Sequence, residues 1–134
     1  MAYAYRYRMP LTLAYADLDY FKHYNDTHGH AAGDVLLQEL VARWSQALRP
    51  SDILARIGGE EFVLVFPGSS LEEAQQIMGR LGEMVPYGQS CSTGLASYRP
   101  GETAEALIGR ADQGLYRAKE TGRNRTVTVE ADGA

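Results

Sequence analysis

Cysteine is nearly missing from this sequence: Cys91 is the only one among 134 residues. A single cysteine excludes an intrachain disulfide, which is typical of a protein from a reducing, cytosolic setting. Long apolar segments are missing too, because no run approaches the roughly 20 residues of a membrane-spanning helix. The apolar run after Pro10 meets Asp17 too soon for a signal peptide. We therefore expect a cytoplasmic domain that makes no contact with a membrane.

The sequence also lacks an excess of positive charge. The 13 lysine and arginine residues are outnumbered by 17 acidic ones, and the formal net charge is −4 at pH 7. We therefore expect no DNA binding, and a polyanionic ligand would need a local cluster of Lys, Arg or metal ions. The composition, 45% hydrophobic and 22% charged, is that of an ordinary globular protein. Its length suits a single domain over residues 1–134.

Hydrophobic patterning divides the chain into strands and helices. Short, mostly apolar runs predict strands at residues 11–19, 53–57, 62–66, 90–97 and 126–129. Helical spacing, with capping signals at the ends, predicts helices at residues 20–29, 31–48, 70–84 and 103–120. The first part of this order is a split βαβ, or ferredoxin-like, arrangement. We therefore expect an α+β fold with a mostly antiparallel central sheet surrounded by helices.

The ferredoxin-like order brings distant carboxylates together. Right-handed crossovers make the first two strands parallel, with the third strand antiparallel between them. The end of the first strand, at Asp17, then lies beside the hairpin tip that carries Glu60 and Glu61. Carboxylates that converge at a sheet edge are costly unless a cation lies among them. Mg²⁺ is the best candidate, because it prefers oxygen ligands and is usually completed by substrate phosphates.

Three other features have more than one explanation. We expect Asp19 to be a helix N-cap rather than a ligand. Gly58 and Gly59 suit a tight turn, but glycine also lets a ligand approach the backbone closely, and the sequence does not separate these reasons. Lys119 and Arg123 flank the end of the last helix, where they suit either the helix dipole or a bound phosphate.

Three motifs together resemble one protein family. G-G-E-E-F at residues 58–62 resembles the signature of GGDEF domains, the diguanylate cyclases, in its Glu variant. D-L-D-Y-F-K-H-Y-N-D-T-H-G-H-A-A-G-D (residues 17–34) and R-A-D-Q-G-L-Y-R-A-K-E-T-G-R-N (residues 110–124) are similar to two further blocks of the family, in the same order. The resemblance covers nearly the whole chain from about Leu11. It implies a palm-like sheet of the nucleotidyl cyclase type, which agrees with the topology expected from the patterning.

The resemblance implies a role for each residue that matches a family position. The carboxylates of Asp17 and Glu60 and the carbonyl of Leu18 match ligands of Mg²⁺, for which Mn²⁺ is a possible substitute. Glu60 also matches the group that takes the proton from an attacking 3′-hydroxyl, and Glu61 supports the metal site. The matches to GTP contacts are Asn25 and Asp34 for guanine, and Lys22, Lys119, Arg123 and the backbone N–H groups of Tyr20 and Phe21 for the triphosphate. Lys22 is expected to act in catalysis as well as in binding.

The implied reaction is the condensation of two GTP molecules into cyclic di-GMP, with release of pyrophosphate. One domain holds one GTP, so a second GGDEF domain must face the first in an antiparallel homodimer. An upstream sensory module is expected in the parent protein. The alternative is a GGDEF domain that acts only as a receptor for GTP or cyclic di-GMP. The presence of Asp17, Lys22 and Glu60 favours the enzyme.

R-P-S-D at residues 49–52 resembles the product-inhibition site of the family. Arg49 and Asp52 would bind cyclic di-GMP, and Arg80 matches the arginine that completes this site from another surface. A helix end followed by a cap is the other explanation of the same four residues.

One departure from the family concerns the first residues. Nothing before Leu11 resembles the helix and the D-x-L-T-G-L-x-N-R segment with which such domains begin, so we expect this part to be lacking.

Overall fold

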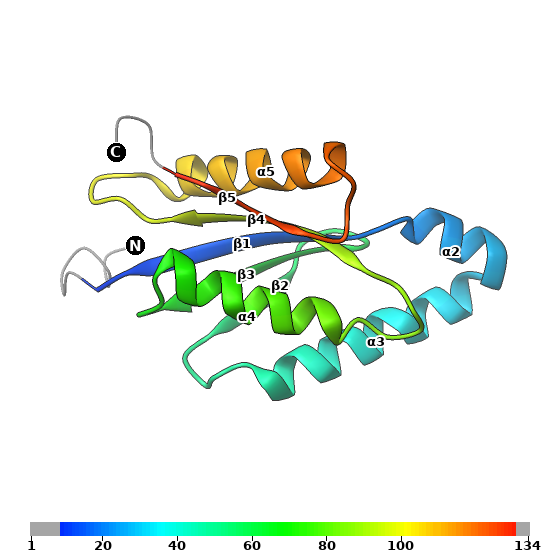
Figure 1. The fold of residues 1–134 in the computed structure, drawn as a ribbon. Coiled ribbons are helices and arrows are strands. Elements are labelled where there is room, and N and C mark those ends of the chain that lie inside the picture. The colour runs from blue at the N-terminus through cyan, green and yellow to red at the C-terminus, as the bar shows by residue number, and fades with distance from the viewer. Residues whose placement is uncertain (1–8, 131–134) are drawn as a thin grey trace.

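A computed structural model describes residues 9–130, so most of the segment before Leu11 lies outside the described residues. Within this range five strands form one sheet in the order β2-β3-β1-β4-β5 (Figure 1). The strands are β1 Leu11–Leu18, β2 Ile53–Arg56, β3 Glu61–Pro67, β4 Cys91–Ser97 and β5 Thr126–Val129. Every neighbouring pair is antiparallel except β4 and β5. The mostly antiparallel sheet is confirmed, and so is the place of β3 between β1 and β2.

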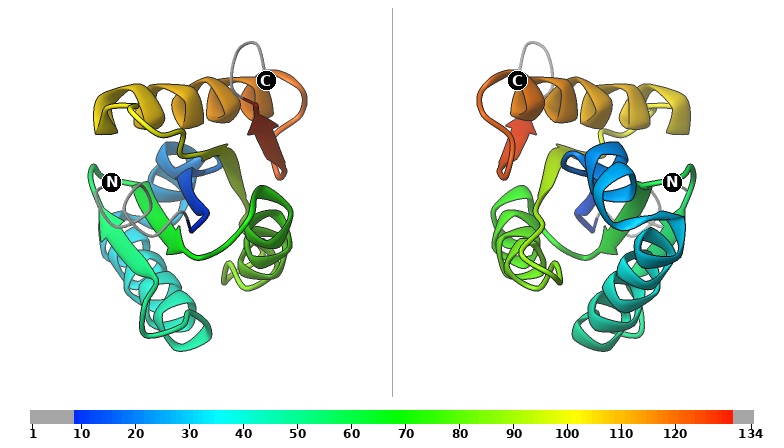
Figure 2. Two further views of the ribbon diagram at one scale, coloured as in Figure 1. Left: turned by 90° about the vertical axis from the view of Figure 1, so that its left-hand side faces the viewer. Right: turned by 90° about the vertical axis from the view of Figure 1, so that its right-hand side faces the viewer.

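The helices of the described range are α2 Phe21–His28, α3 His30–Ala47, α4 Leu71–Glu83 and α5 Ala104–Glu120. Figure 2 shows α5 on one face of the sheet and α3 and α4 on the opposite face. The predicted capping box opens α4, because Ser70 Oγ accepts the Glu73 N–H at 3.2 Å and the Glu73 carboxylate accepts the Ser70 N–H at 3.0 Å. No helix within residues 9–130 has both the length and the apolar character needed to cross a membrane.

The side chains of β1 alternate between two hydrophobic clusters, one on each face of the sheet. Ala14, Ala16 and Leu18 are buried with residues of α3 and α4. Leu11 and Leu13 are buried with residues of α5. Strand side chains alternate between the two faces. Asp17 therefore lies on the same face as Leu11 and Leu13, the face that α5 covers.

Three contacts hold α5 and a residue just before it in place on the sheet. Gly94 of β4 lies so close to the helix that a Cβ atom there would overlap the carbonyl oxygen of Ala111. Just before the helix, Glu102 forms an ion pair with Arg110 at 2.7 Å, and their side chains are only 5% and 11% exposed. Arg110 Nη2 also donates to the carbonyl oxygen of Ser97 at 2.5 Å. These contacts set the course of α5, which ends beside the end of β1.

Candidate active site

The end of β1 lies beside the hairpin tip between β2 and β3, as the sequence predicts (Figure 1). The Leu18 N–H donates to the carbonyl oxygen of Glu60 at 3.1 Å, and Asp17 is paired in register with Glu61. The side chain of Asp17 is only 9% exposed, and its Oδ2 lies 2.5 Å from Nζ of Lys119 in the last turn of α5. The structure therefore gathers the end of β1, the hairpin tip and the end of α5.

The two glycines of the hairpin tip are not required by the backbone conformation. Neither Gly58 nor Gly59 has a φ in the left-handed region. A Cβ atom on Gly59 would meet no atom within 4 Å outside its chain neighbours. The carbonyl oxygens of both glycines accept hydrogen bonds from Arg56 Nε, at 3.2 and 2.9 Å. The tip therefore leaves open space beside Gly59, and neither glycine adopts the left-handed backbone that a Gly-Gly turn suggests.

Tyr15 is a residue that the sequence analysis did not single out. It lies on the same face of β1 as Asp17. Burial and the neighbouring negative charge of Glu61 raise the pKa of Tyr15. A tyrosine in an apolar strand gives no local signal of such a neighbour. Tyr15 therefore lies with Glu61 beside the end of β1.

The oxygen atoms at this end of β1 suit a hard divalent cation. Among residues 9–130 no three His, Cys, Asp or Glu side chains gather closely enough to hold a metal ion by themselves. Asp17 and Glu60 offer two carboxylates, and Leu18 offers a carbonyl. This small set fits Mg²⁺, which keeps several waters and is completed by substrate phosphates. The positive group now beside Asp17 is the Lys119 ammonium, so the position already accommodates a cation.

Asp19 does not cap α2, and the prediction of an N-cap there is wrong. The N-cap position belongs to Tyr20, whose φ of 55° is left-handed, and no side chain caps the helix. Asp19 is only 3% exposed. Its carboxylate accepts hydrogen bonds from the hydroxyls of Ser90 and Ser92, both at 2.6 Å. These partners lie 71 and 73 residues further along the chain, where no local pattern could reveal them.

The turn that follows α5 also contacts Asp19. The N–H of Asn124 donates to Asp19 Oδ2 at 2.9 Å, and Arg123 Nη1 lies 3.9 Å from Oδ1. The guanidinium carbon of Arg123 lies 4.7 Å from the centre of the Tyr20 ring. Arg123, the predicted phosphate contact in the turn that follows α5, therefore lies next to the start of α2.

The start of α2 is suited to an anion. The first N–H groups of a helix that begins at Phe21 have no acceptor within the helix, and the helix dipole favours negative charge there. Lys22 is exposed in the same turn. The predicted triphosphate contacts thus come from two places: the first turn of α2, and the end of α5 with the turn that follows it. The two places meet at Tyr20 and Arg123.

Asn25 and Asp34, the predicted guanine contacts, lie on two neighbouring helices. The Oδ1 of Asn25 on α2 is buried and has no hydrogen-bond partner among residues 9–130. It lies so close to Gly33 on α3 that a Cβ atom there would overlap it. Asp34 is exposed and lines an open pocket of about 330 Å³, with Leu37, Gln38, Val41 and Arg56. Gly33 was missed by the sequence analysis, and a glycine inside a helix was its only signal.

Comparison with known families agrees with this geometry. The family model described as "Diguanylate cyclase, GGDEF domain" matches residues 1–125. This chain belongs to the GGDEF domain family. The solved structures of similar shape include the GGDEF domain of DgcB from Caulobacter crescentus in complex with c-di-GMP, with a TM-score of 0.90 and 30% identity over 95% of this chain and 82% of that one. The palm-like fold is thereby confirmed.

Two further comparisons concern sequence relatives and a GGEEF domain. The chain is 42% identical to diguanylate cyclase DgcP of Pseudomonas aeruginosa, over 86% of this chain and 19% of that protein. It is 38% identical to response regulator PleD of Caulobacter vibrioides, over 88% of this chain and 29% of that protein. The chain thus spans less than a third of either relative. An active GGEEF domain of a diguanylate cyclase from Vibrio cholerae has a TM-score of 0.88 and 30% identity, over 98% of this chain and 90% of that one.

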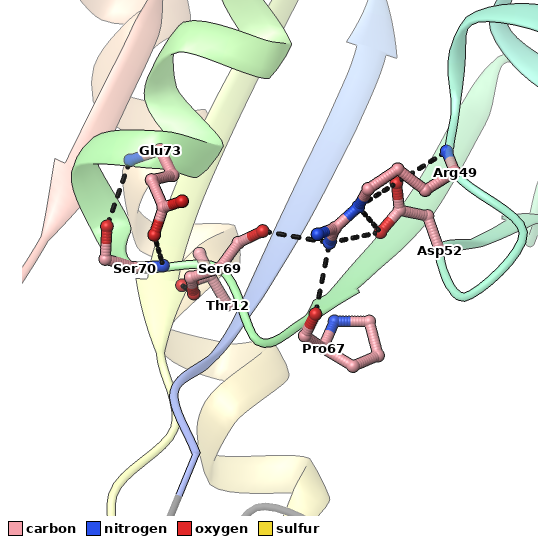
Figure 3. Close-up of polar contacts among 7 residues, drawn as sticks. All are labelled: Thr12, Arg49, Asp52, Pro67, Ser69, Ser70 and Glu73. Carbon is pink, nitrogen blue, oxygen red and sulfur yellow. Dashed lines mark hydrogen bonds and ion pairs between the residues drawn. The ribbon is translucent and has the colours of Figure 1, made fainter.

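Figure 3 shows Arg49 and Asp52 of the predicted product-inhibition site. They contact Pro67, which pairs with Leu11 at the end of the sheet opposite to Asp17 and Glu61. Arg49 Nε and Nη2 donate to the Asp52 carboxylate at distances from 2.8 to 3.3 Å. Nη2 also donates to the carbonyl oxygen of Pro67 at 3.1 Å and to Ser69 Oγ at 3.0 Å. The side chain of Asp52 is 1% exposed and that of Arg49 is 49% exposed. The pair is therefore already assembled, with half of the arginine open to solvent.

Of the local explanation of R-P-S-D, the helix end is present and the cap is not: α3 ends at Ala47, Asp52 Oδ2 accepts the Arg49 N–H at 2.9 Å in a turn, and β2 begins at Ile53. The hydrogen bond to Asp52 raises the pKa of Arg49. Arg80 is exposed near the end of α4, about 15 Å along the helix from Ser70. No contact recorded between described residues joins Arg80 to Arg49 or Asp52. The structure brings Arg49 and Asp52 together but leaves Arg80 apart from them.

Proposed function

We propose that this GGDEF domain condenses two GTP molecules into cyclic di-GMP and releases pyrophosphate. The observation that carries the proposal is the meeting of the end of β1, the hairpin tip and the end of α5, where Asp17 lies 2.5 Å from Lys119. Oxygen ligands and basic side chains in one place suit the transfer of a nucleotidyl group. The relatives that are diguanylate cyclases support the same reaction.

In the proposed mechanism, Asp17, Glu60 and the carbonyl of Leu18 would hold Mg²⁺, or Mn²⁺ in its place. When bound, the ion would stabilise negative charge on the phosphate oxygens. Glu60 accepts the proton of a 3′-hydroxyl from the facing GTP, and that oxygen forms a bond to the α-phosphorus. The bond to pyrophosphate breaks, and Lys119 and Arg123 stabilise its charge. The same step, with the roles of the two GTP molecules exchanged, closes the ring and releases the second pyrophosphate.

Four further side chains have supporting roles in this proposal. Lys22, in the first turn of α2, binds the triphosphate together with the backbone N–H groups of Tyr20 and Phe21. Glu61 supports the metal site, with Tyr15 as its neighbour on β1. Asn25 and Asp34 select guanine. A carboxylate can accept both the N1–H and the exocyclic amine of guanine, whereas adenine offers no such pair of donors.

We further propose that Arg49 and Asp52 bind the product and thereby limit its synthesis, with Arg80 contributed from another surface. The half-exposed guanidinium of Arg49, held by Asp52, supports this role. Cyclic di-GMP is titrated by calorimetry into the wild type and Arg49→Ala. We expect the variant to bind at least tenfold more weakly, since a charge-assisted contact to phosphate is lost. Equal affinities would contradict the product site.

Turnover is proposed to need two facing copies, in the cytoplasm and under the control of an upstream sensory module. The test of the reaction is incubation with GTP and Mg²⁺, with and without a fused dimeriser, followed by nucleotide chromatography. We expect cyclic di-GMP from the dimerised domain. Glu60→Gln should abolish the product while GTP still binds without metal, and Glu72→Gln, an exposed change on α4, should have no effect. A dimerised domain that binds nucleotide but makes no product would favour the receptor function instead.

A further inference from the structure

The carboxylate of Asp19 is the most completely bonded acidic group at the candidate active site. It is nearly buried, and two serine hydroxyls, one backbone N–H and one guanidinium surround it. A carboxylate out of water is costly unless donors replace the lost hydration. Three hydrogen-bond donors do so here, with a guanidinium nearby, and they come from the start of β4 and from the turn that follows α5. Asp19 therefore ties three separate segments to one point.

The turn that Asp19 holds has an unusual backbone. Arg123 and Asn124 have φ values of 64° and 48°, although neither is a glycine. Two left-handed non-glycine residues in a row are uncommon and persist only where other contacts impose them. The hydrogen bond from the Asn124 N–H to Asp19 is such a contact. On the other side, the Arg123 N–H donates to the carbonyl oxygen of Ala118 at 2.8 Å.

This backbone determines where the Arg123 guanidinium lies. The guanidinium is 3.9 Å from Asp19 Oδ1 and 4.7 Å from the centre of the Tyr20 ring, and its side chain is 31% exposed. At 3.9 Å the ion pair is too long for a hydrogen bond, so the donors of Arg123 are free of Asp19. Asp19 attracts the guanidinium without binding it, and the ring of Tyr20 supports it from one face.

The start of α2 is fixed by the same residue. The Asp19 N–H donates to the carbonyl oxygen of Ser90 at 2.9 Å, so both its backbone and its side chain are held by the start of β4. The next residue, Tyr20, turns the chain into α2 with its left-handed φ. One buried aspartate thus sets both the first N–H groups of α2 and the guanidinium that follows α5.

We infer that Asp19 is a positioning residue for the triphosphate: it holds Arg123 and the start of α2 in the arrangement that receives the β- and γ-phosphates, without touching the substrate. This inference rests on the proposed function, because it assigns a role within GTP binding. It assigns Asp19 no metal ion and no proton transfer. A residue with this role affects the binding of the triphosphate. It leaves the contacts to guanine unchanged, because Asn25 lies against Gly33 of α3 and not against Asp19.

The experiment compares GTP and GMP binding in the undimerised domain. Asp19→Asn keeps the size of the side chain but removes its charge. It also places an amide NH2, itself a donor, among the donors that now bond the carboxylate. We expect affinity for the α,β-methylene analogue of GTP, measured by calorimetry with Mg²⁺, to fall roughly tenfold, as for loss of a charge-assisted contact. Affinity for GMP should stay within about twofold. In the dimerised fusion, KM for GTP should rise more than kcat falls.

Three further single variants separate positioning from stability. Glu102→Gln removes another nearly buried carboxylate that pairs with an arginine, at the far end of α5, and should lower the melting temperature without changing GTP affinity. In a double-mutant cycle, Asp19→Asn and Arg123→Gln should be strongly non-additive toward the GTP analogue, because one acts through the other. If Asp19→Asn does not fold, Ser92→Ala is tested in its place. It removes one hydrogen bond to Asp19 and should lower the affinity for the GTP analogue by a smaller factor.

Unchanged binding of the GTP analogue by the tested variant would overturn the inference. Equal losses toward GTP and GMP, or additive effects in the cycle, would overturn it as well, since they indicate a general structural role. If the wild type makes cyclic di-GMP and the variant binds the GTP analogue as the wild type does, the role of Asp19 is refuted and the proposed function stands. A wild type that binds neither GTP nor its analogue refutes the proposed function, and the inference falls with it.

Discussion

At the residue scale, Lys119 and Asp17 are the pair on which the candidate site depends most directly. Their side chains are 31% and 9% exposed, and the helix supplies this cation from 102 residues further along the chain. A nearly buried carboxylate is costly without a positive neighbour. The same carboxylate is the one proposed to bind Mg²⁺. The ammonium and the metal ion therefore compete for one group when no nucleotide is present.

This competition gives a prediction for metal binding without nucleotide. Lys119→Gln should raise the affinity for Mn²⁺ up to about fivefold, since a partly exposed ion pair contributes about 1 kcal/mol or less. The same change should weaken GTP binding, because the ammonium is then missing from the triphosphate. Electron paramagnetic resonance of free Mn²⁺ measures the first effect and calorimetry measures the second.

Lys22→Gln is the matched control for Lys119→Gln. Lys22 is exposed in the first turn of α2, and the recorded ion pair of Asp17 is with Lys119. The control should weaken GTP binding while the affinity for Mn²⁺ stays the same. An unchanged Mn²⁺ affinity in Lys119→Gln would show that the ammonium does not occupy the place of the metal.

The pairing itself could not be predicted from the sequence. Lys119 near a helix end has a sufficient local explanation in the helix dipole, and a motif can assign it a phosphate, but neither states what it contacts in the absence of ligand. Asp19 is the stronger case. The local pattern favoured an N-cap, whereas Ser90, Ser92 and Asn124 lie at least 71 residues away in sequence. Such contacts follow from the sheet order and not from neighbouring residues.

At the element scale, the contact between α2 and α3 determines how Asn25 is presented. Gly33 is buried in α3, and the absence of a side chain there lets Asn25 lie against the helix. The Asn25 Oδ1 is left buried without a partner among the described residues, a state that is costly unless a ligand supplies a donor. Guanine has donors on the edge that it would present to this oxygen.

Gly33→Ala tests the importance of this contact between helices. The added methyl group would overlap the Asn25 side chain, which must then rotate away. We expect GTP affinity to fall about tenfold, the loss of a buried hydrogen bond and some packing, and the preference for GTP over ATP to shrink. Calorimetry with both nucleotides measures the change.

Gly109→Ala provides the control within a helix. A Cβ atom at Gly109 of α5 meets nothing within 4 Å, so this change should stabilise the domain by about 0.4–1 kcal/mol and leave GTP binding intact. Urea denaturation measures the free energy of unfolding of both variants. If Gly33→Ala binds GTP as the wild type does, Asn25 does not need the position that the structure gives it.

Elements whose signals are local could be predicted from the sequence. The Ser70–Glu73 capping box and the apolar face that includes Leu36, Leu40 and Trp44 gave α4 and α3 within a residue or two. The hairpin tip was less predictable. A Gly-Gly pair suggests left-handed turn residues, yet neither glycine adopts them. The sequence alone does not distinguish a glycine that the backbone requires from one that only leaves space beside it.

At the scale of the whole molecule, α5 joins the active site at one end to a buried ion pair at the other. Burial alone would raise the pKa of Glu102, but hydrogen bonds and charge from Arg110, together with the Arg99 N–H, outweigh it, so that the pKa is lowered below 4.5. A group whose folded-state pKa is lowered stabilises the fold above its unfolded pKa and loses this contribution as pH falls through the folded value.

The prediction concerns the difference in free energy of unfolding between the wild type and Glu102→Gln. This difference should be largest near pH 7 and should shrink as the pH falls below 4.5, the ordinary pKa of a glutamate, and through the lowered folded-state pKa of Glu102, where the carboxylate takes up a proton. Urea denaturation at several pH values measures it. Glu72→Gln, at an exposed position, should show no such trend. A difference that stays constant down to pH 3 would mean that the ion pair with Arg110 does not hold the carboxylate ionised.

The last prediction follows from the number of sites in one molecule. In the proposed function one domain holds one GTP, so the 3′-hydroxyl that attacks comes from a GTP held elsewhere. If the second GTP is held by a second copy, the initial rate of the undimerised domain should rise with the square of its concentration while it remains mostly monomeric. A fused dimeriser should make the rate linear in concentration and raise the activity per molecule at low concentration. Nucleotide chromatography over a hundredfold range of protein, with light scattering on the same samples, measures both. A linear rate from a demonstrated monomer would mean that one domain completes the reaction alone, and the need for facing copies would be wrong.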